Sequence, residues 1–164
     1  MTTDHEPEPG PELGPELVTI PLTATAVVRD VVPMAALRDF FDGSFRDLDR
    51  VLSAQGVAVA GPAFGRFRGP IGATVDVEVG FATDRTVQPN GAVVAGSLPG
   101  GRVARLVHAG AFDRLGSSWE RLRTWIEGQG LSAADDRWEV YLTQPSPAAD
   151  PSTLRTELNW PITG

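Results

Sequence analysis

The chain contains no cysteine and no lysine, and only two of its 164 residues are histidine. The absence of cysteine excludes a disulfide framework, a thiolate metal site and a cysteine nucleophile. His5 and His108 alone do not make a convincing zinc site. No apolar run reaches the ~18 residues that would cross a bilayer, so no membrane association is expected.

Several motifs of enzymes and nucleotide-binding proteins are also absent. There is no Gly-x-Ser-x-Gly nucleophile elbow, no Gly-x-x-x-x-Gly-Lys loop and no Gly-x-Gly-x-x-Gly fingerprint. We therefore expect no cofactor. The N-terminus is acidic where a signal peptide would be basic and then apolar, so the cytoplasm is the expected location.

The net charge of -7 is concentrated at the N-terminus. Five carboxylates precede Leu17, and the remaining body has 16 acidic and 14 basic residues, which leaves a net charge of about -2. A nearly neutral body lacks the basic surface that a phosphate backbone requires, so direct nucleic-acid binding is not expected. Residues 1–16 are Pro- and Glu-rich and are predicted to be disordered, with a single domain over 17–164.

Hydrophobic periodicity within this domain predicts an α+β fold. Two segments, 44–55 and 117–129, have apolar residues at the three- and four-residue spacing of amphipathic helices. Gly56 is expected to end the first helix. The segments predicted as strands are rich in β-branched residues or alternate in polarity: 18–20, 26–32, 57–67, 74–81, 102–107, 138–143 and 154–162.

The two predicted helices match each other when the chain is shifted by 74 residues. Ser44 then aligns with Ser118, and the Gly56 helix stop aligns with Gly130. This indicates two tandem strand-helix-strand-strand units, at about 24–87 and 101–162, related by a pseudo-twofold axis. Chance similarity between two amphipathic helices is the alternative.

The alternating strands predict which side chains face the helices. Their apolar residues, including Trp138, are expected to cover the helices. The polar residues Asp76, Glu78, Glu139 and Tyr141 should then point to the opposite face. If the two units pair, that face is expected to border a ligand groove between them.

Four short motifs occur in an order that resembles a known family. They are Gly61–Phe64, His108–Asp113, Trp138–Leu142 and Arg155–Pro161. Together they are similar to GyrI-like effector-binding domains, over about residues 24–162. These domains sense ligands in multidrug-responsive transcription regulators and also occur alone.

The resemblance implies an antiparallel sheet with an aromatic-lined cleft and a glutamate that faces lipophilic cations. Glu139 is the matching residue. In place of the family's frequent Gly-Pro-Tyr the chain has Gly110–Ala111–Phe112, which keeps an aromatic ring but loses a hydroxyl. The predicted ligand-binding residues are Glu139, Tyr141, Trp119, Phe112, Phe45, Trp160 and Glu78. Ordinary core packing is the alternative for the aromatic residues, and a solvated or paired carboxylate for the acids.

Three functions remain open at this point. The first is binding of a lipophilic small molecule, cationic or planar, by a protein without a DNA-binding domain. The second is hydrolysis of strained-ring electrophilic genotoxins, with Glu139 activating water. The third is a protein-interaction or inhibitor module with a protein partner, which a large exposed apolar patch would favour.

Overall fold

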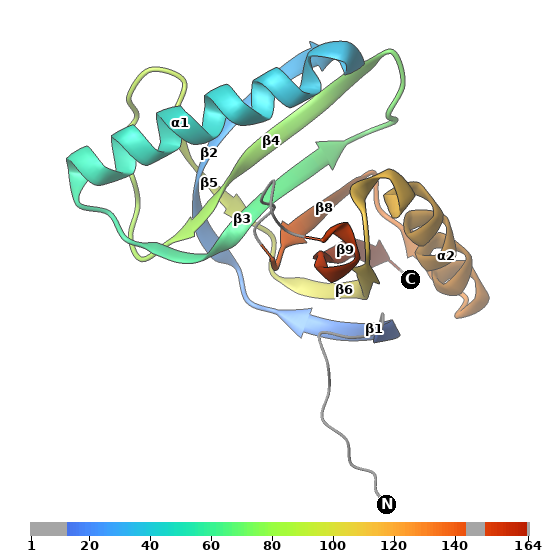
Figure 1. The fold of residues 1–164 in the computed structure, drawn as a ribbon. Helices are drawn as coiled ribbons and strands as arrows, with labels where there is room; N and C mark the ends of the chain where they lie inside the picture. Colours follow the sequence, from blue (N-terminus) through green and yellow to red (C-terminus); the bar gives the residue numbers. More distant parts are fainter. Residues whose placement is uncertain (1–12, 144–149, 164) are drawn as a thin grey trace, which may run out of the picture.

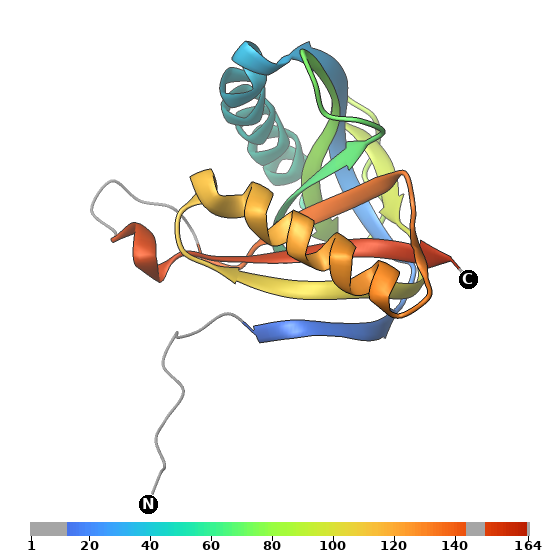
Figure 2. The same ribbon diagram turned by 90° about the vertical axis from the view of Figure 1, so that its right-hand side faces the viewer.

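Two helices cover one face of a curved antiparallel sheet (Figures 1 and 2). A computed structural model describes residues 13–143 and 150–163. The helices are α1 (Leu37–Gln55) and α2 (Leu115–Gly128), each preceded by a 3-10 turn. The strands are β1 (Leu13–Ile20), β2 (Thr23–Pro33), β3 (Val59–Arg68), β4 (Thr74–Thr83), β5 (Val94–Leu98), β6 (Gly101–Ala109), β7 (Ser132–Ala133), β8 (Asp136–Tyr141) and β9 (Arg155–Thr163).

The same order of elements occurs twice along the chain. The first unit runs β2, α1, β3, β4, and the second runs β6, α2, β8, β9 with the short β7 between α2 and β8. The sheet order is β1-β6-β9-β8-β3-β4-β2-β5, so the antiparallel pair β3–β8 joins the units. This establishes the α+β fold with an antiparallel sheet, while the internal duplication itself stays a prediction.

The two units exchange their leading strands. β1 precedes β2 in the chain but pairs with β6, whereas β5 precedes β6 and pairs with β2. The links at 21–22 and 99–100 cross where these strands change partners. At this crossing a Cβ on Gly100 would lie 2.7 Å from the backbone nitrogen of Leu22. The sequence pattern did not indicate β5.

Each helix packs on its own apolar cluster. α1 contributes Leu48, Val51 and Leu52 to a cluster with the valines of β2 and β4. α2 contributes Trp119, Leu122 and Ile126 to a cluster with β6 and β9. Figure 1 shows α1 lying over β2 and β4, with α2 on the other unit. The alternating valines of β4 thus face their helix as expected.

The face away from the helices, here called the inner face, has a third cluster. It contains residues from β1 and β5, at opposite ends of the sheet order, together with Phe64 and Trp138. Because these strands share one cluster, the sheet must curl until its two ends approach each other. Trp138 was expected to face its helix, and this is wrong because the curl gives the inner face an apolar core of its own.

The helix stops are confirmed and one helix start is wrong. Gly56 ends α1 with a φ of 65°, in the left-handed region that glycine adopts readily, and Gly130 follows α2 with a φ of 76°. α1 begins at Leu37 rather than at Ser44, which is buried inside the helix. Burial of the apolar residues in its first turns outweighs the ~1 kcal/mol cost of Gly43 within the helix.

The expected boundary of the N-terminal tail also changes. Residues 13–16 lie in β1, so the paired part of the chain starts before Leu17. The rest of the predicted tail, residues 1–12, lies outside the described residues. Within the described residues, no helix has the length and apolar character needed to cross a bilayer.

Candidate ligand-binding site around Glu139

Glu139 lies where the two units meet, on the helix-covered face of the sheet. It shares this face of β8 with Arg137 and Tyr141, and its backbone pairs with Gly65 of β3. The prediction that Glu139 and Tyr141 point away from the helices is wrong. In β8 the apolar row of Trp138 and Val140 faces the inner core, which turns the polar row toward α1 and α2.

The Glu139 carboxylate is buried and accepts a hydrogen bond at each oxygen. Its residue is 7% exposed. The indole Nε1 of Trp119 donates to Oε2 over 3.0 Å, and the Tyr141 hydroxyl donates to Oε1 over 3.0 Å. Two donors of this kind stabilise the ionised form of a carboxylate.

An aromatic cluster surrounds this carboxylate, with members from both units. The Tyr141 ring packs edge to face against Phe112 at 6.0 Å and against Phe41 of α1 at 6.3 Å. Phe41 in turn packs against Phe45 at 6.1 Å. Phe112 is 39% exposed and gives the cluster a solvent-facing edge. We call these rings the aromatic site: Phe41, Phe45, Phe112, Trp119 and Tyr141.

Gly65 makes room for the rings that cover Glu139. A Cβ at this position would lie 2.7 Å from the Tyr141 hydroxyl oxygen and 3.0 Å from Cζ of Phe41. Only a residue without a side chain lets both rings lie over the junction of β3 and β8. The space beside Glu139 is therefore occupied by the protein's own rings.

Burial shifts the ionisation of both polar groups at the centre of the site. Burial raises the pKa of Glu139, while the hydrogen bonds from Trp119 and Tyr141 and the charges of Arg137 and His108 oppose this shift. The pKa of Tyr141 is raised well above its usual value by burial and then by the Glu139 charge. Tyr141 is thus held as a phenol that donates to Glu139.

Arg137 is a member of this site that no sequence motif indicated. Its guanidinium carbon lies 4.8 Å from the ring centroid of Trp119 and 4.9 Å from that of Trp160. These distances are typical of cation–π contacts. Burial lowers the pKa of Arg137, and the charge of Glu139 opposes that shift.

A buried polar pair lies behind Trp119. His108 of β6 has its Nδ1 2.7 Å from Ser118 Oγ and its Nε2 2.9 Å from the carbonyl oxygen of Ala111. Because a carbonyl only accepts, Nε2 carries a proton here, and Nδ1 lies within hydrogen-bond distance of the Ser118 hydroxyl oxygen. His108 fixes the start of α2, and with it Trp119, against β6.

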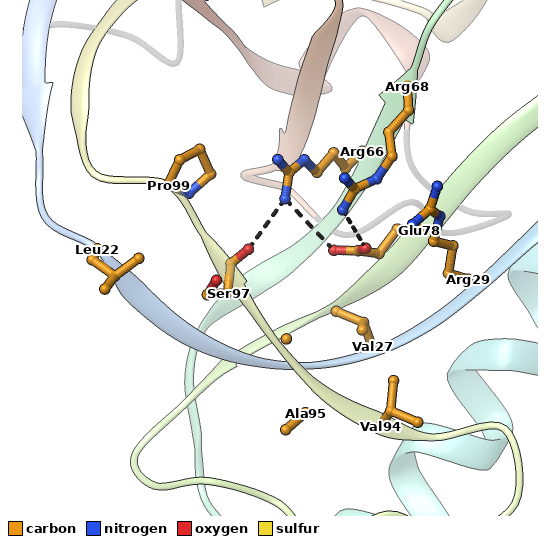
Figure 3. A pocket seen from close by; sticks show the side chains of 11 residues that line it. Leu22, Val27, Arg29, Arg66, Arg68, Glu78, Val94, Ala95, Ser97 and Pro99 are labelled. Carbon is orange, nitrogen blue, oxygen red and sulfur yellow. Dashed lines mark hydrogen bonds and ion pairs between the residues drawn. The ribbon is translucent and has the colours of Figure 1, made fainter.

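Two of the predicted ligand-binding residues do not join the aromatic site directly. Trp160 is 5% exposed, packs edge to face behind Trp119 at 5.3 Å and donates from Nε1 to the carbonyl oxygen of Ala134. Glu78 lies on the inner face, where it pairs with Arg68 at 2.8 Å and Arg66 at 3.9 Å (Figure 3). Among the other predicted residues, Trp119 and Tyr141 contact Glu139 directly. Phe112 packs on Tyr141, and Phe45 joins the cluster through Phe41.

Two hollows lie elsewhere on the molecule. One, of about 490 Å³, is lined by Arg66, Arg68 and Glu78 together with β5 (Figure 3). The other, of about 540 Å³, lies between Pro15 and the outer side of α2. Neither is lined by Glu139, so the groove expected between the units stays a prediction. Within 13–143 and 150–163, no cluster of three acidic or histidine side chains is placed to hold a metal ion.

Phe41 and Arg137 were missed for identifiable reasons. Phe41 lies four residues before Phe45, and the helical pattern would have included it had α1 been extended past Gly43. Arg137 lies two residues before Glu139 and therefore shares its face of β8. A correct choice of face would have placed it beside Glu139.

The sequence profile of the GyrI-like small molecule binding domain matches residues 14–163. The match spans most of the chain, which therefore belongs to the GyrI-like small-molecule-binding domain family. A comparison with curated proteins found no match.

Solved structures share this fold at low sequence identity. The EcmrR C-terminal domain has a TM-score of 0.80 and 18% identity, over 92% of this chain and 97% of that one. SAV2435, solved bound to tetraphenylphosphonium, has a TM-score of 0.66 and 10% identity, over 93% and 95%. A hydrolase from Listeria innocua has a TM-score of 0.65 and 15% identity, over 91% of each chain.

Proposed function

We propose that this protein binds a lipophilic aromatic small molecule at the aromatic site, with Glu139 as its central polar group. One observation carries the proposal: Glu139 is a buried carboxylate enclosed by aromatic rings, in a domain of a small-molecule-binding family. Rings provide flat contact area for a ligand, and a desolvated carboxylate attracts hydrogen-bond donors or positive charge.

Ligand entry requires the rings over Gly65 to move. Phe112 and Tyr141 meet at the exposed edge of the site, and Phe41 closes it from α1. A flat ligand that replaces the Phe41–Tyr141 contact would stack between the two units and take over the hydrogen bond at Oε1. The binding of tetraphenylphosphonium by SAV2435, which has the same fold, supports a lipophilic aromatic ligand.

Tryptophan-fluorescence titration tests the proposal with a cation, 1-methylquinolinium, and its neutral isostere, 1-methylnaphthalene. We expect saturable quenching by at least one probe. Glu139→Gln should weaken cation binding by about tenfold relative to the neutral probe, because it removes a buried negative charge. Glu127→Gln is the control, since its side chain is 65% exposed on the outer side of α2.

Hydrolysis of strained-ring electrophiles is the second candidate. The raised pKa of Glu139, caused by burial, suits a carboxyl that acts as a general acid or base. The likeness to a hydrolase from Listeria innocua is a further reason to test it. Mass spectrometry after incubation with a cyclopropane electrophile distinguishes the two: saturable quenching with the compound recovered intact supports binding, and Glu139-dependent ring opening supports the enzyme. Absence of both leaves a protein-interaction role.

A further inference from the structure

The Arg137 guanidinium lies against Trp119, the residue whose indole also donates to Glu139. Trp119 and Trp160 meet edge to face with an interplanar angle of 88°. The Arg137 guanidinium lies within 5 Å of both ring centroids, at 4.8 and 4.9 Å. A planar guanidinium stacks well on such faces and keeps its charge at physiological pH.

Arg137 is also the main charge that acts on Glu139. Among the neighbouring charges, that of Glu139 has the largest effect on the pKa of Arg137, and that of Arg137 has the largest effect on the pKa of Glu139. Glu120 and Arg123 of α2 act on Arg137 more weakly and with opposite signs. The centre of the site therefore holds one negative and one positive group.

We propose that Arg137 is a built-in cation that makes the aromatic site select neutral aromatic ligands over cationic ones. This inference rests on the proposed function and specifies the charge of its ligand. A cationic ligand would be repelled by the Arg137 guanidinium, which already lies over the Trp119 ring and beside the Glu139 carboxylate. A neutral aromatic ligand avoids that repulsion, and its desolvation costs less free energy than that of a cation.

The test measures the affinities of 1-methylquinolinium and 1-methylnaphthalene from the indole N–H signals of Trp119 and its neighbours by NMR. Wild type should bind the neutral probe more tightly. Arg137→Gln should raise the affinity for the cation relative to the neutral probe by about tenfold. Arg137→Met provides a second neutral variant that fills the space between the two rings. Arg137→Lys keeps the charge and should keep the wild-type preference.

Two further variants complete the design. Arg123→Gln removes a guanidinium that lies 5.9 Å from the Trp160 ring and pairs with Glu127. This variant should change the ratio of the affinities for the cationic and the neutral probe by less than about twofold. The double variant Glu139→Gln/Arg137→Gln should restore a ratio close to that of wild type, because both charges are lost together.

The outcomes separate this inference from the proposed function. An unchanged ratio in Arg137→Gln, an equal change in Arg123→Gln, or a wild type that prefers the cation would overturn the inference alone. If neither probe binds any of the variants, the proposed function fails and the inference fails with it.

Discussion

Burial and hydrogen bonding act on the Glu139 proton in opposite directions. Burial favours the neutral acid, whereas the donors Trp119 and Tyr141 favour the carboxylate, and burial has the larger effect. A glutamine fits the same partners, since its oxygen accepts from Trp119 and its amide donates to the Tyr141 oxygen after the hydroxyl turns. Glu139→Gln is therefore expected to keep the fold.

This balance predicts how stability depends on pH. With a pKa raised by burial, Glu139 holds its proton more tightly in the folded state than in the unfolded state, where glutamate titrates at about 4.3. The unfolded state then binds fewer protons between these two values, so stability falls as pH rises through that window and levels off above it. In urea unfolding from pH 4 to 8, the free energy of unfolding of Glu139→Gln should rise relative to that of wild type as the pH rises.

The exposed Glu127 provides the comparison for that measurement. Glu127→Gln should follow the wild-type pH dependence, because its side chain stays in water in both states. A difference between Glu139→Gln and wild type that stays constant across the pH range would contradict the burial of this carboxylate.

Sequence reasoning named most residues of the aromatic site but did not predict its geometry. Family motifs pointed to Glu139, Tyr141 and Phe112, and the helix pattern pointed to Trp119 and Phe45. Arg137 carries no motif, and its role depends on Trp160, which lies 23 positions further along the chain. Such a contact arises from the pairing of β8 with β9, which no local pattern fixes.

Among the elements, strand alternation predicted the existence of the strands better than their orientation. In β4 the apolar row faces α1, as expected from an ordinary two-layer packing. In β8 the apolar row faces the inner core, which exists because the sheet curls and brings β1 and β5 together. Periodicity reports that two faces differ and does not report which one a helix covers.

The crossing of the two strand links depends on close backbone contact at Gly100. A Cβ there would lie 2.7 Å from Leu22 N and 3.2 Å from the carbonyl carbon of Pro21. Since these atoms belong to the backbone, they yield less readily than a flexible side chain. Gly100→Ala should lower the free energy of unfolding by about 1–3 kcal/mol, measured by urea denaturation.

Gly14 offers a matched control in β1. A Cβ at Gly14 would meet no atom within 4 Å. Gly14→Ala should therefore leave stability unchanged within about 0.5 kcal/mol or raise it slightly. Equal effects of the two alanines would argue against a tight crossing.

At the scale of the whole molecule, the aromatic residues are distributed unevenly between the units. All four tryptophans follow residue 118 and lie in the second unit. Tryptophan fluorescence therefore reports the second unit, whereas far-UV circular dichroism reports both. Comparing the two signals shows whether the units unfold together.

We expect Leu48→Ala and Leu122→Ala each to cost about 2–5 kcal/mol, because each leaves a cavity in a fully buried cluster. The two clusters belong to different helices, so the costs should add within about 0.5 kcal/mol. The inner core and the β3–β8 pair join the units, and both signals should therefore shift together in either variant. Separate transitions in Leu48→Ala would show that the units unfold independently.

The exchange of leading strands has a consequence for the chain when it is divided. A fragment that ends after β5 keeps β1 but has lost β6, the strand that β1 pairs with. Within that fragment, β5 still pairs with β2, whereas β1 has no partner strand. The unpaired β1 is an open edge that a second copy of the fragment can satisfy, as in domain swapping. In the intact chain the two units are therefore held together by strand pairing as well as by covalent linkage, because each provides the strand that completes one edge of the other.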